Sequence, residues 1–153
     1  MKQKKLLDLK NARLPEQKEK MGKIMVAGVC PFCPKYLKKY HDHPIEKIGK
    51  FWAVTKNDYP YKGSKLHYLF IYKRHIENIS QISPLSLVEL TNQIRALIKK
   101  HKIPGGALVM RFGDSDYTSA SVTHLHAHLI SGGKIQKNKN EELNVPVGYK
   151  LKK

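Results

Sequence analysis

The segment from His124 to Leu129 constrains the fold more than any other part of the chain. Histidine and an apolar residue alternate through H-L-H-A-H-L. In a β-strand, residues i, i+2 and i+4 share a face, so this pattern predicts three imidazoles on one face and an apolar face toward a core. Successive imidazoles lie about 6.6 Å apart along such a strand. The middle one, His126, is therefore the natural reacting group.

Other segments predict a single domain of the α+β class. A helix is expected from Ser83 as N-cap and Pro84 as first helical residue to the breaker at 104–106. The small-residue segment 113–121 is expected to be a loop. Strands are predicted in 45–55 (two short strands around a turn at Gly49), 66–72, 107–112 and 122–130.

The charge is strongly positive and spread over the chain. There are 29 Lys and Arg against 12 Asp and Glu, a formal net charge of +17. We divide the sequence into a basic N-terminal arm (1–23), a domain (24–133) and a basic C-terminal tail (134–153), with net charges of +5, +8 and +4. Such a field attracts nucleic acid, nucleotides or acidic membrane surfaces, although a Lys-rich surface can also serve solubility alone.

Composition excludes several classes of protein. The chain is 41% hydrophobic, too much for global disorder, and it lacks the run of about 18 apolar residues of a transmembrane helix. The first residues lack the apolar run of a secretory signal, so we expect a cytoplasmic protein without a membrane partner. The arm is expected to be mobile or a short amphipathic helix, with Pro15 and Gly22 as breakers.

The three histidines suggest chemistry at phosphorus. A neutral imidazole is nucleophilic, and its ordinary pKa lies near 7. A nitrogen nucleophile can attack phosphorus and form a labile phosphohistidine. The competing interpretation is a surface stripe or an adventitious metal site, but three alternating histidines on an apolar-backed strand favour a reactive site.

Cys30 and Cys33 form a Cys-x-x-Cys pair in a turn. A thioredoxin-like redox pair needs a helix that starts just after the first cysteine, and Pro34 argues against it. Half of a zinc site fits better, but it needs two more ligands. Two sets of histidines are available: His41 with His43, or His75 with His124.

Four blocks across residues 28–132 resemble the histidine triad (HIT) family and occur in its order. They are N-D-Y-P-Y, H-Y-L-F-I-Y-K-R-H, S-A-S-V-T and H-L-H-A-H-L-I. The second departs from the family at Tyr72, where proline is usual. The resemblance implies a HIT-like fold: an antiparallel sheet of about five strands, one long helix and a shorter helix or arm.

The resemblance also implies hydrolysis or transfer at the α-phosphate of a nucleotide through a nucleotidyl-histidine. By position, His126 corresponds to the nucleophile, and His128 and His67 to partners on the phosphate side. Ser121 corresponds to the serine that holds the phosphate or leaving group. Asn57 stands where a ribose-binding residue is expected.

Arg111 stands where many members carry asparagine, and it could contact phosphate or face solvent. Phe32, Trp52 and Tyr59 are candidates for stacking on a base, although Trp52 is expected to be core.

Zinc-containing relatives resemble the second ligand set, so Cys30, Cys33, His75 and His124 are the expected ligands. Four protein ligands leave no position for water, which makes such a zinc structural. Zinc on His124 would also hold one end of the triad strand.

Three functions stay open. The first is a hydrolase of small nucleotides, of the dinucleoside polyphosphate or phosphoramidate type. The second is removal of adenylate from nucleic-acid ends, favoured by the +17 charge. The third is a zinc-stabilised nucleotide-binding module without turnover. A homodimer is a further expectation, because family members often dimerise.

Overall fold

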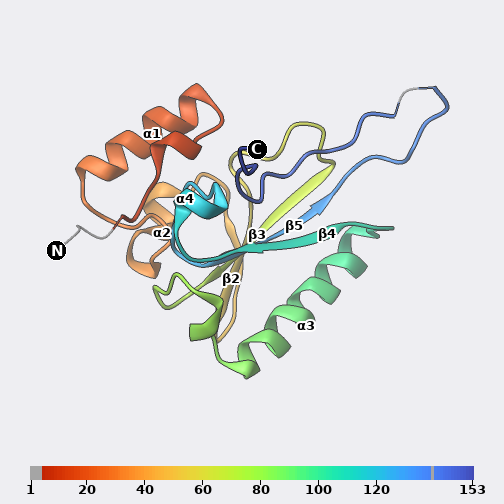
Figure 1. Cartoon of the computed structure of the whole chain (residues 1–153). Coiled ribbons are helices and arrows are strands. Elements are labelled where there is room, and N and C mark those ends of the chain that lie inside the picture. The colour runs from red at the N-terminus through yellow and green to blue at the C-terminus, as the bar shows by residue number, and fades with distance from the viewer. Residues whose placement is uncertain (1–4, 139) are drawn as a thin grey trace.

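A computed structural model describes residues 5–138 and 140–153. Five antiparallel strands form one sheet in the order β1-β2-β3-β5-β4, with helices on both faces (Figure 1). This confirms the α+β class. The strands are β1 (Ile45–Ile48), β2 (Trp52–Lys56), β3 (Leu66–Tyr72), β4 (Ala107–Arg111) and β5 (His126–Ser131). The α-helices are α1 (Pro15–Val26), α2 (Pro34–Tyr40), α3 (Pro84–His101) and α4 (Ser115–Thr118), and short 3-10 turns are η1 (Leu9–Asn11) and η2 (Ile79–Gln81).

The two faces of the sheet pack against different helices. Leu125, Ala127 and Leu129 pack with α3 in the main core, as the alternation predicts. Leu37 of α2 packs on the opposite face, against Leu69 and other residues of β2 and β3. The sheet therefore has an apolar layer under α3, while α1 and α2 lie on its other side (Figure 1). His126 and His128 share a cleft there with residues of α1.

Strand β5 begins at His126, four residues later than expected. The preceding Leu125 still donates its N–H to Ile76 O at 2.7 Å and accepts from Tyr72 N at 3.1 Å. Side chains thus continue to alternate before the regular ladder starts. His124 lies in this irregular stretch, where its ring meets the two cysteines.

Helix α3 begins as predicted, with Ser83 as N-cap and Pro84 first in the helix, although the Ser83 hydroxyl makes no capping hydrogen bond. It ends at His101, ahead of the Pro-Gly-Gly breaker. Lys102 closes it in the left-handed region, with φ 50°.

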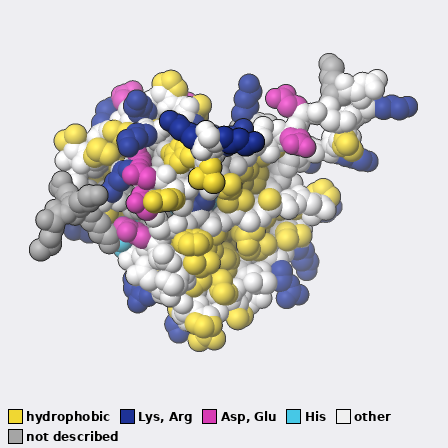
Figure 2. Space-filling view, viewed as in Figure 1, with side chains coloured by type: hydrophobic (Ala, Val, Ile, Leu, Met, Phe, Trp, Pro, Cys, Tyr) yellow, Lys and Arg dark blue, Asp and Glu magenta, His cyan; other side chains and the backbone are white. Residues whose placement is uncertain are grey.

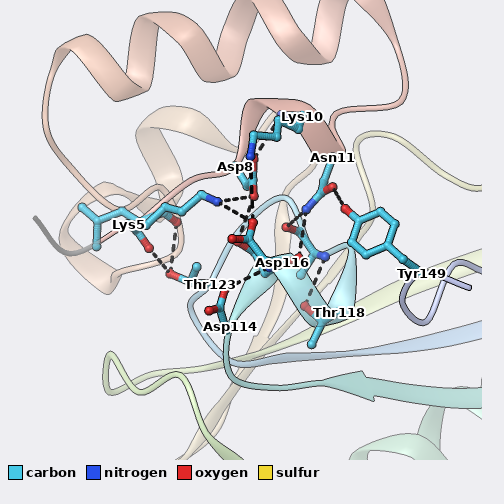
Figure 3. Close-up of polar contacts among 12 residues, drawn as sticks. Lys5, Asp8, Lys10, Asn11, Asp114, Asp116, Thr118, Thr123 and Tyr149 are labelled. Carbon is cyan, nitrogen blue, oxygen red and sulfur yellow. Dashed lines mark hydrogen bonds and ion pairs between the residues drawn. The ribbon is translucent and has the colours of Figure 1, made fainter. Parts of the chain in front are cut away.

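The N-terminal segment is attached to the sheet domain. Leu7 forms an isolated bridge with Val122, and the Asp8 N–H donates to Ser121 O at 2.8 Å. The buried Asp8 carboxylate accepts from Ser115 Oγ at 2.9 Å and pairs with Lys5 Nζ at 2.5 Å (Figure 3). Ser115 belongs to α4, a one-turn helix within the segment expected to be a loop.

The arm was expected to be either mobile or a short amphipathic helix. In its described part, the structure shows helix α1. Pro15 begins this helix, but Gly22 lies inside it, so the prediction of Gly22 as a breaker was wrong. Met21 and Ile24 pack with Leu7 in a second apolar cluster. The helix continues past residue 23, and the predicted division into arm, domain and tail stays a prediction.

The C-terminal tail returns to the N-terminal segment. The Tyr149 hydroxyl hydrogen-bonds Asn11 Oδ1 (Figure 3), and Pro146 O accepts from Arg111 Nη1 at 3.1 Å. The tail therefore contacts both the described N-terminal segment and β4.

Strand β4 forms an edge of the sheet, where Leu108 is half exposed. Hydrophobic side chains gather across the middle of the face seen in Figure 2, where β4 crosses the view in Figure 1. The homodimer stays a prediction. None of the helices in the described ranges combines the length and apolar character that a membrane span requires.

Candidate active site and metal centre

A cleft that is open to solvent lies over the histidine face of the sheet. Its walls come from α1, the Cys-x-x-Cys turn, the β2–β3 loop, β4, the approach to β5 and the tail. The structure brings most of the predicted site residues to this cleft: Phe32, Asn57, Tyr59, Arg111, Ser121, His126 and His128.

The ring of His126 presents a free nitrogen. Its Nδ1 lies 2.7 Å from His124 O, and because a carbonyl only accepts, Nδ1 carries the proton. Nε2 therefore keeps its lone pair. Burial lowers the pKa of His126 to about 3, and the charge of Arg111 adds to this effect. Phe32 packs edge-on against the ring at 5.0 Å.

His67 and His128 form a hydrogen-bonded pair from adjacent strands. Leu69 is opposite His128 in the β3–β5 register, which places His67 diagonally beside it. His67 Nε2 lies 2.8 Å from His128 Nδ1. The Tyr61 N–H donates to His67 Nδ1 at 3.2 Å, so the His67 proton is on Nε2 and points to His128.

This bond pattern leaves His128 with its proton on Nε2, 3.3 Å from Arg111 Nη2. Two donors then face each other. The reverse tautomers give the Asn57 amide nitrogen an acceptor at His67 Nε2 but move the conflict to Tyr61 N–H, so neither set of tautomers provides every donor with an acceptor. With the proton on His128 Nε2, an anionic oxygen between Arg111 and His128 accepts from both and removes the conflict between these two groups.

The other two imidazoles are also neutral at physiological pH. Burial, followed by the charges of Arg13 and Arg111, lowers the pKa of His67 to about 4. Burial and the neighbouring His126 hold the pKa of His128 well below its ordinary value. Positive charge at the cleft therefore comes from Arg13, Lys20 and Arg111 rather than from protonated histidine.

The remaining predicted residues differ in their placement. Asn57 Oδ1 accepts from Tyr59 N at 3.0 Å, and its amide nitrogen lies 3.1 Å from His67 Nε2. Trp52 is fully buried and donates from Nε1 to Ser86 O at 2.8 Å. It packs in the main core, as expected, and has no stacking surface to offer a base.

Cleft residues from the arm were missed in the sequence. Arg13 reaches the cleft from the turn before α1, and its guanidinium lies 4.4 Å from the centre of the Tyr61 ring. Gln17 and Met21 follow it on α1. Tyr61 belongs to the N-D-Y-P-Y block, so the family resemblance could have indicated it as a site residue. Arg13 is one basic residue among many, and nothing in the sequence distinguishes it.

A second cluster, the four-donor cluster, joins Cys30, Cys33, His75 and His124. Their ligand atoms all lie within 4.8 Å of one another. Cys30 Sγ is 3.4 Å from His124 Nδ1, and Cys33 Sγ is 3.4 Å from His75 Nδ1. Around a tetrahedral zinc ion the S···N separation is about 3.6 Å, so the cluster fits a metal ion of that kind.

Polar contacts of the Nε2 atoms, which point away from the cysteines, orient both histidines of the cluster. His124 Nε2 donates to Tyr72 O at 2.5 Å, and His75 Nε2 pairs with Glu77 at 3.3 Å, which leaves each Nδ1 free for a metal. Burial raises the pKa of the Cys30 thiol to about 12, so a thiolate there needs a cation beside it.

The alternative ligands His41 and His43 lie elsewhere. His41 Nε2 hydrogen-bonds Lys56 O at 2.8 Å, and both rings approach the Asp58 carboxylate at 3.3 Å. They belong to a polar cluster that supports the β2–β3 loop.

With the geometry in place, the family can be assigned. The family model described as "Scavenger mRNA decapping enzyme C-term binding" matches residues 30–141. The chain belongs to this family. The match begins at Cys30 and ends beyond β5, so it includes both clusters and leaves α1 outside.

Solved structures of histidine triad proteins share the fold. A "Hit Like Protein" is 24% identical, with a TM-score of 0.53, and covers 65% of this chain and 95% of its own. A HIT family hydrolase from Clostridium thermocellum is 23% identical, with a TM-score of 0.53 and coverage of 68% and 91%. A hypothetical histidine triad nucleotide-binding protein from Sulfolobus tokodaii strain7 is 23% identical, with a TM-score of 0.55 and coverage of 79% and 81%. No curated protein gave a match.

The lowered pKa of His67 predicts acid sensitivity. The unfolded chain binds a proton at the ordinary pKa of 6.5, but the folded chain does so only near about 4. The contribution of His67 to the free energy of unfolding is therefore fully present above about pH 6.5 and is lost as the pH falls to about 4. In His67→Gln, the slope of unfolding free energy against pH in this range should decrease by about 1.4 kcal/mol per pH unit.

Urea unfolding at a series of pH values measures this slope. Circular dichroism at pH 8 controls for the fold of the variant. An unchanged slope in the variant would contradict a neutral, buried His67.

Proposed function

We propose that the protein is a nucleotide hydrolase that acts at the α-phosphate through a nucleotidyl-His126 intermediate. The observation that carries this proposal is the free Nε2 of His126, which lies in a cleft beside the converging donors of Arg111 and His128. A nucleophilic nitrogen next to an anion-accepting position is the arrangement that attack on a phosphate needs.

In the first step, His126 Nε2 attacks the α-phosphorus and a P–N bond forms. The bond from phosphorus to the leaving group breaks, and the leaving group takes its electron pair. The leaving group departs as an anion, and the N–H of His128 and the guanidinium of Arg111 stabilise its charge. In the second step, water attacks phosphorus and releases a proton to solvent, the P–N bond breaks and a nucleoside monophosphate departs. His126 regains its lone pair and His128 keeps its proton throughout.

Other cleft residues bind and orient the nucleotide in this proposal. Arg111 holds a nonbridging oxygen and disperses the developing charge. Ser121 assists on the phosphate or leaving group, and Asn57 contacts the ribose. Phe32 and Tyr59 supply surfaces for the base.

The proposed metal in the four-donor cluster is a structural zinc. Two thiolates and two imidazoles in a closed set are the ligands zinc prefers, and they leave no position for a reacting water. When bound, the ion supplies a fixed charge and a link between the Cys-x-x-Cys turn and the start of β5. Thiolate ligands suit the reducing, cytoplasmic setting that we propose.

Two substrate types remain within the proposal: a small nucleotide conjugate and an adenylated nucleic-acid end. The family takes its name from mRNA decapping enzymes, which supports a nucleotide substrate of either size. The net charge of +17 supports a nucleic acid, and binding to one should weaken steeply with salt.

Removal of one cluster ligand should remove the metal. The purified protein is expected to hold about one zinc ion per chain, and Cys33→Ser should lose most of it and unfold at a lower temperature. Elemental analysis and thermal unfolding measure the two effects. His43→Ala is the control, because His43 lies outside the cluster, and it should keep the metal. Full zinc content in Cys33→Ser would contradict the assigned site.

Loss of the nucleophile should abolish turnover. His126→Ala is expected to lower the rate of AMP release by about 1,000-fold or more, because the P–N intermediate cannot form. The assay compares diadenosine tetraphosphate, adenosine 5′-phosphoramidate and a 5′-adenylated oligonucleotide by chromatography, with His43→Ala as control. Failure of the wild type on all three substrates would contradict the hydrolase and favour a nucleotide-binding module. Full activity of His126→Ala would contradict the assigned nucleophile.

A further inference from the structure

Two arginines face the cleft without carboxylate partners. Arg111 comes from β4 and is half-buried beside His128. Arg13 comes from the turn before α1 and lies exposed at the mouth. Across residues 5–138 and 140–153, neither guanidinium forms an ion pair with Asp or Glu. Each is close enough to the triad for its charge to act on His67.

Arg13 is held in place by its surroundings. Its backbone N–H donates to Gln17 Oε1 at 2.9 Å, and its guanidinium donates from Nη2 to Tyr59 O at 2.5 Å. The guanidinium covers the Tyr61 ring at 4.4 Å, and that ring stacks on His67 at 4.8 Å. The cation is therefore fixed one aromatic ring away from the histidines, with donors left over for a ligand.

The charges in the cleft do not balance in the free protein. Lys20, the other cation that lines the cleft, is already paired with Asp42 at 2.8 Å and Asp58 at 3.5 Å. The two arginines are therefore the cations left for a ligand to neutralise. The phosphate next to the nucleophile brings one negative charge, which Arg111 can meet. A second anionic group on the substrate would pair with Arg13.

We infer that Arg13 is a specificity-determining residue that binds a second phosphate, so that the substrate class is nucleoside phosphoanhydrides rather than phosphoramidates with a single phosphate. This inference rests on the proposed nucleotide site. Arg13 lies before residue 30, where the family match begins, so the second anion site is a feature of this chain's arm.

Kinetics with two substrates test the inference. Arg13→Met should lower kcat/KM for diadenosine tetraphosphate by about 10- to 100-fold, the size of a lost charge-assisted hydrogen bond. For adenosine 5′-phosphoramidate it should change kcat/KM by less than about 3-fold, because no second phosphate is present. Lys18→Met is the matched control: it removes the same charge from an exposed position of the adjacent helix α1, and it should change neither value.

Calorimetric binding of ADP and AMP gives a readout that does not need turnover. The wild type should bind ADP about 10-fold more tightly than AMP, and Arg13→Met should lose this preference. If the wild type hydrolyses neither substrate but shows the Arg13-dependent preference for ADP, the proposed function fails and the assignment of a second phosphate to Arg13 stands. An equal loss on both substrates, or unchanged values with an unchanged ADP preference, would overturn the inference.

Discussion

The pairing of β3 with β5 is the interaction on which the rest of the structure depends. Its register sets His126 opposite Ile71 and His128 opposite Leu69. A slip by one residue would turn these imidazoles into the apolar core under α3 and expose Ala127 and its neighbours instead. Because the core layer contains fully buried residues such as Phe70, that slip is strongly disfavoured. The histidine face is thus specified by hydrophobic burial on the other face.

The four-donor cluster adds a second constraint at the start of β5. His124 precedes the regular strand, so backbone pairing alone holds it weakly. Its ring instead meets Cys30 and Cys33 from the turn before α2, while Tyr72 O accepts from its other nitrogen. His124 also supplies the carbonyl that sets the tautomer of His126. A metal in this cluster and the proposed nucleophile two residues later would therefore be mechanically linked, although the metal would touch no reacting atom.

Much of the fold and of the site could be predicted from local patterns. The alternation of histidine and apolar residues up to Leu129 predicted the strand and its two faces, and Ser83-Pro84 predicted the start of α3. The resemblance to the HIT family gave the second pair of cluster histidines, which no local spacing could decide.

Features that depend on distant contacts could not be predicted. Helix α4 begins at the Asp114 N-cap, and Ser115 inside it bonds Asp8 from the far end of the chain. Arg13 enters the cleft because the arm is anchored through Leu7 and Val122, more than a hundred residues apart. Nothing in its neighbours along the sequence marks it, since its role arises from charges that only the fold brings together.

The central claim is that His126 Nε2 forms a covalent bond to the α-phosphorus of a nucleotide. The most direct test is intact-protein mass spectrometry after rapid mixing with diadenosine tetraphosphate and quenching in base, which preserves a P–N bond, followed by peptide mapping. The account predicts a transient gain of one adenylyl group per chain, located on His126. Steady turnover with no adduct at any time, or an adduct on another residue, would contradict it.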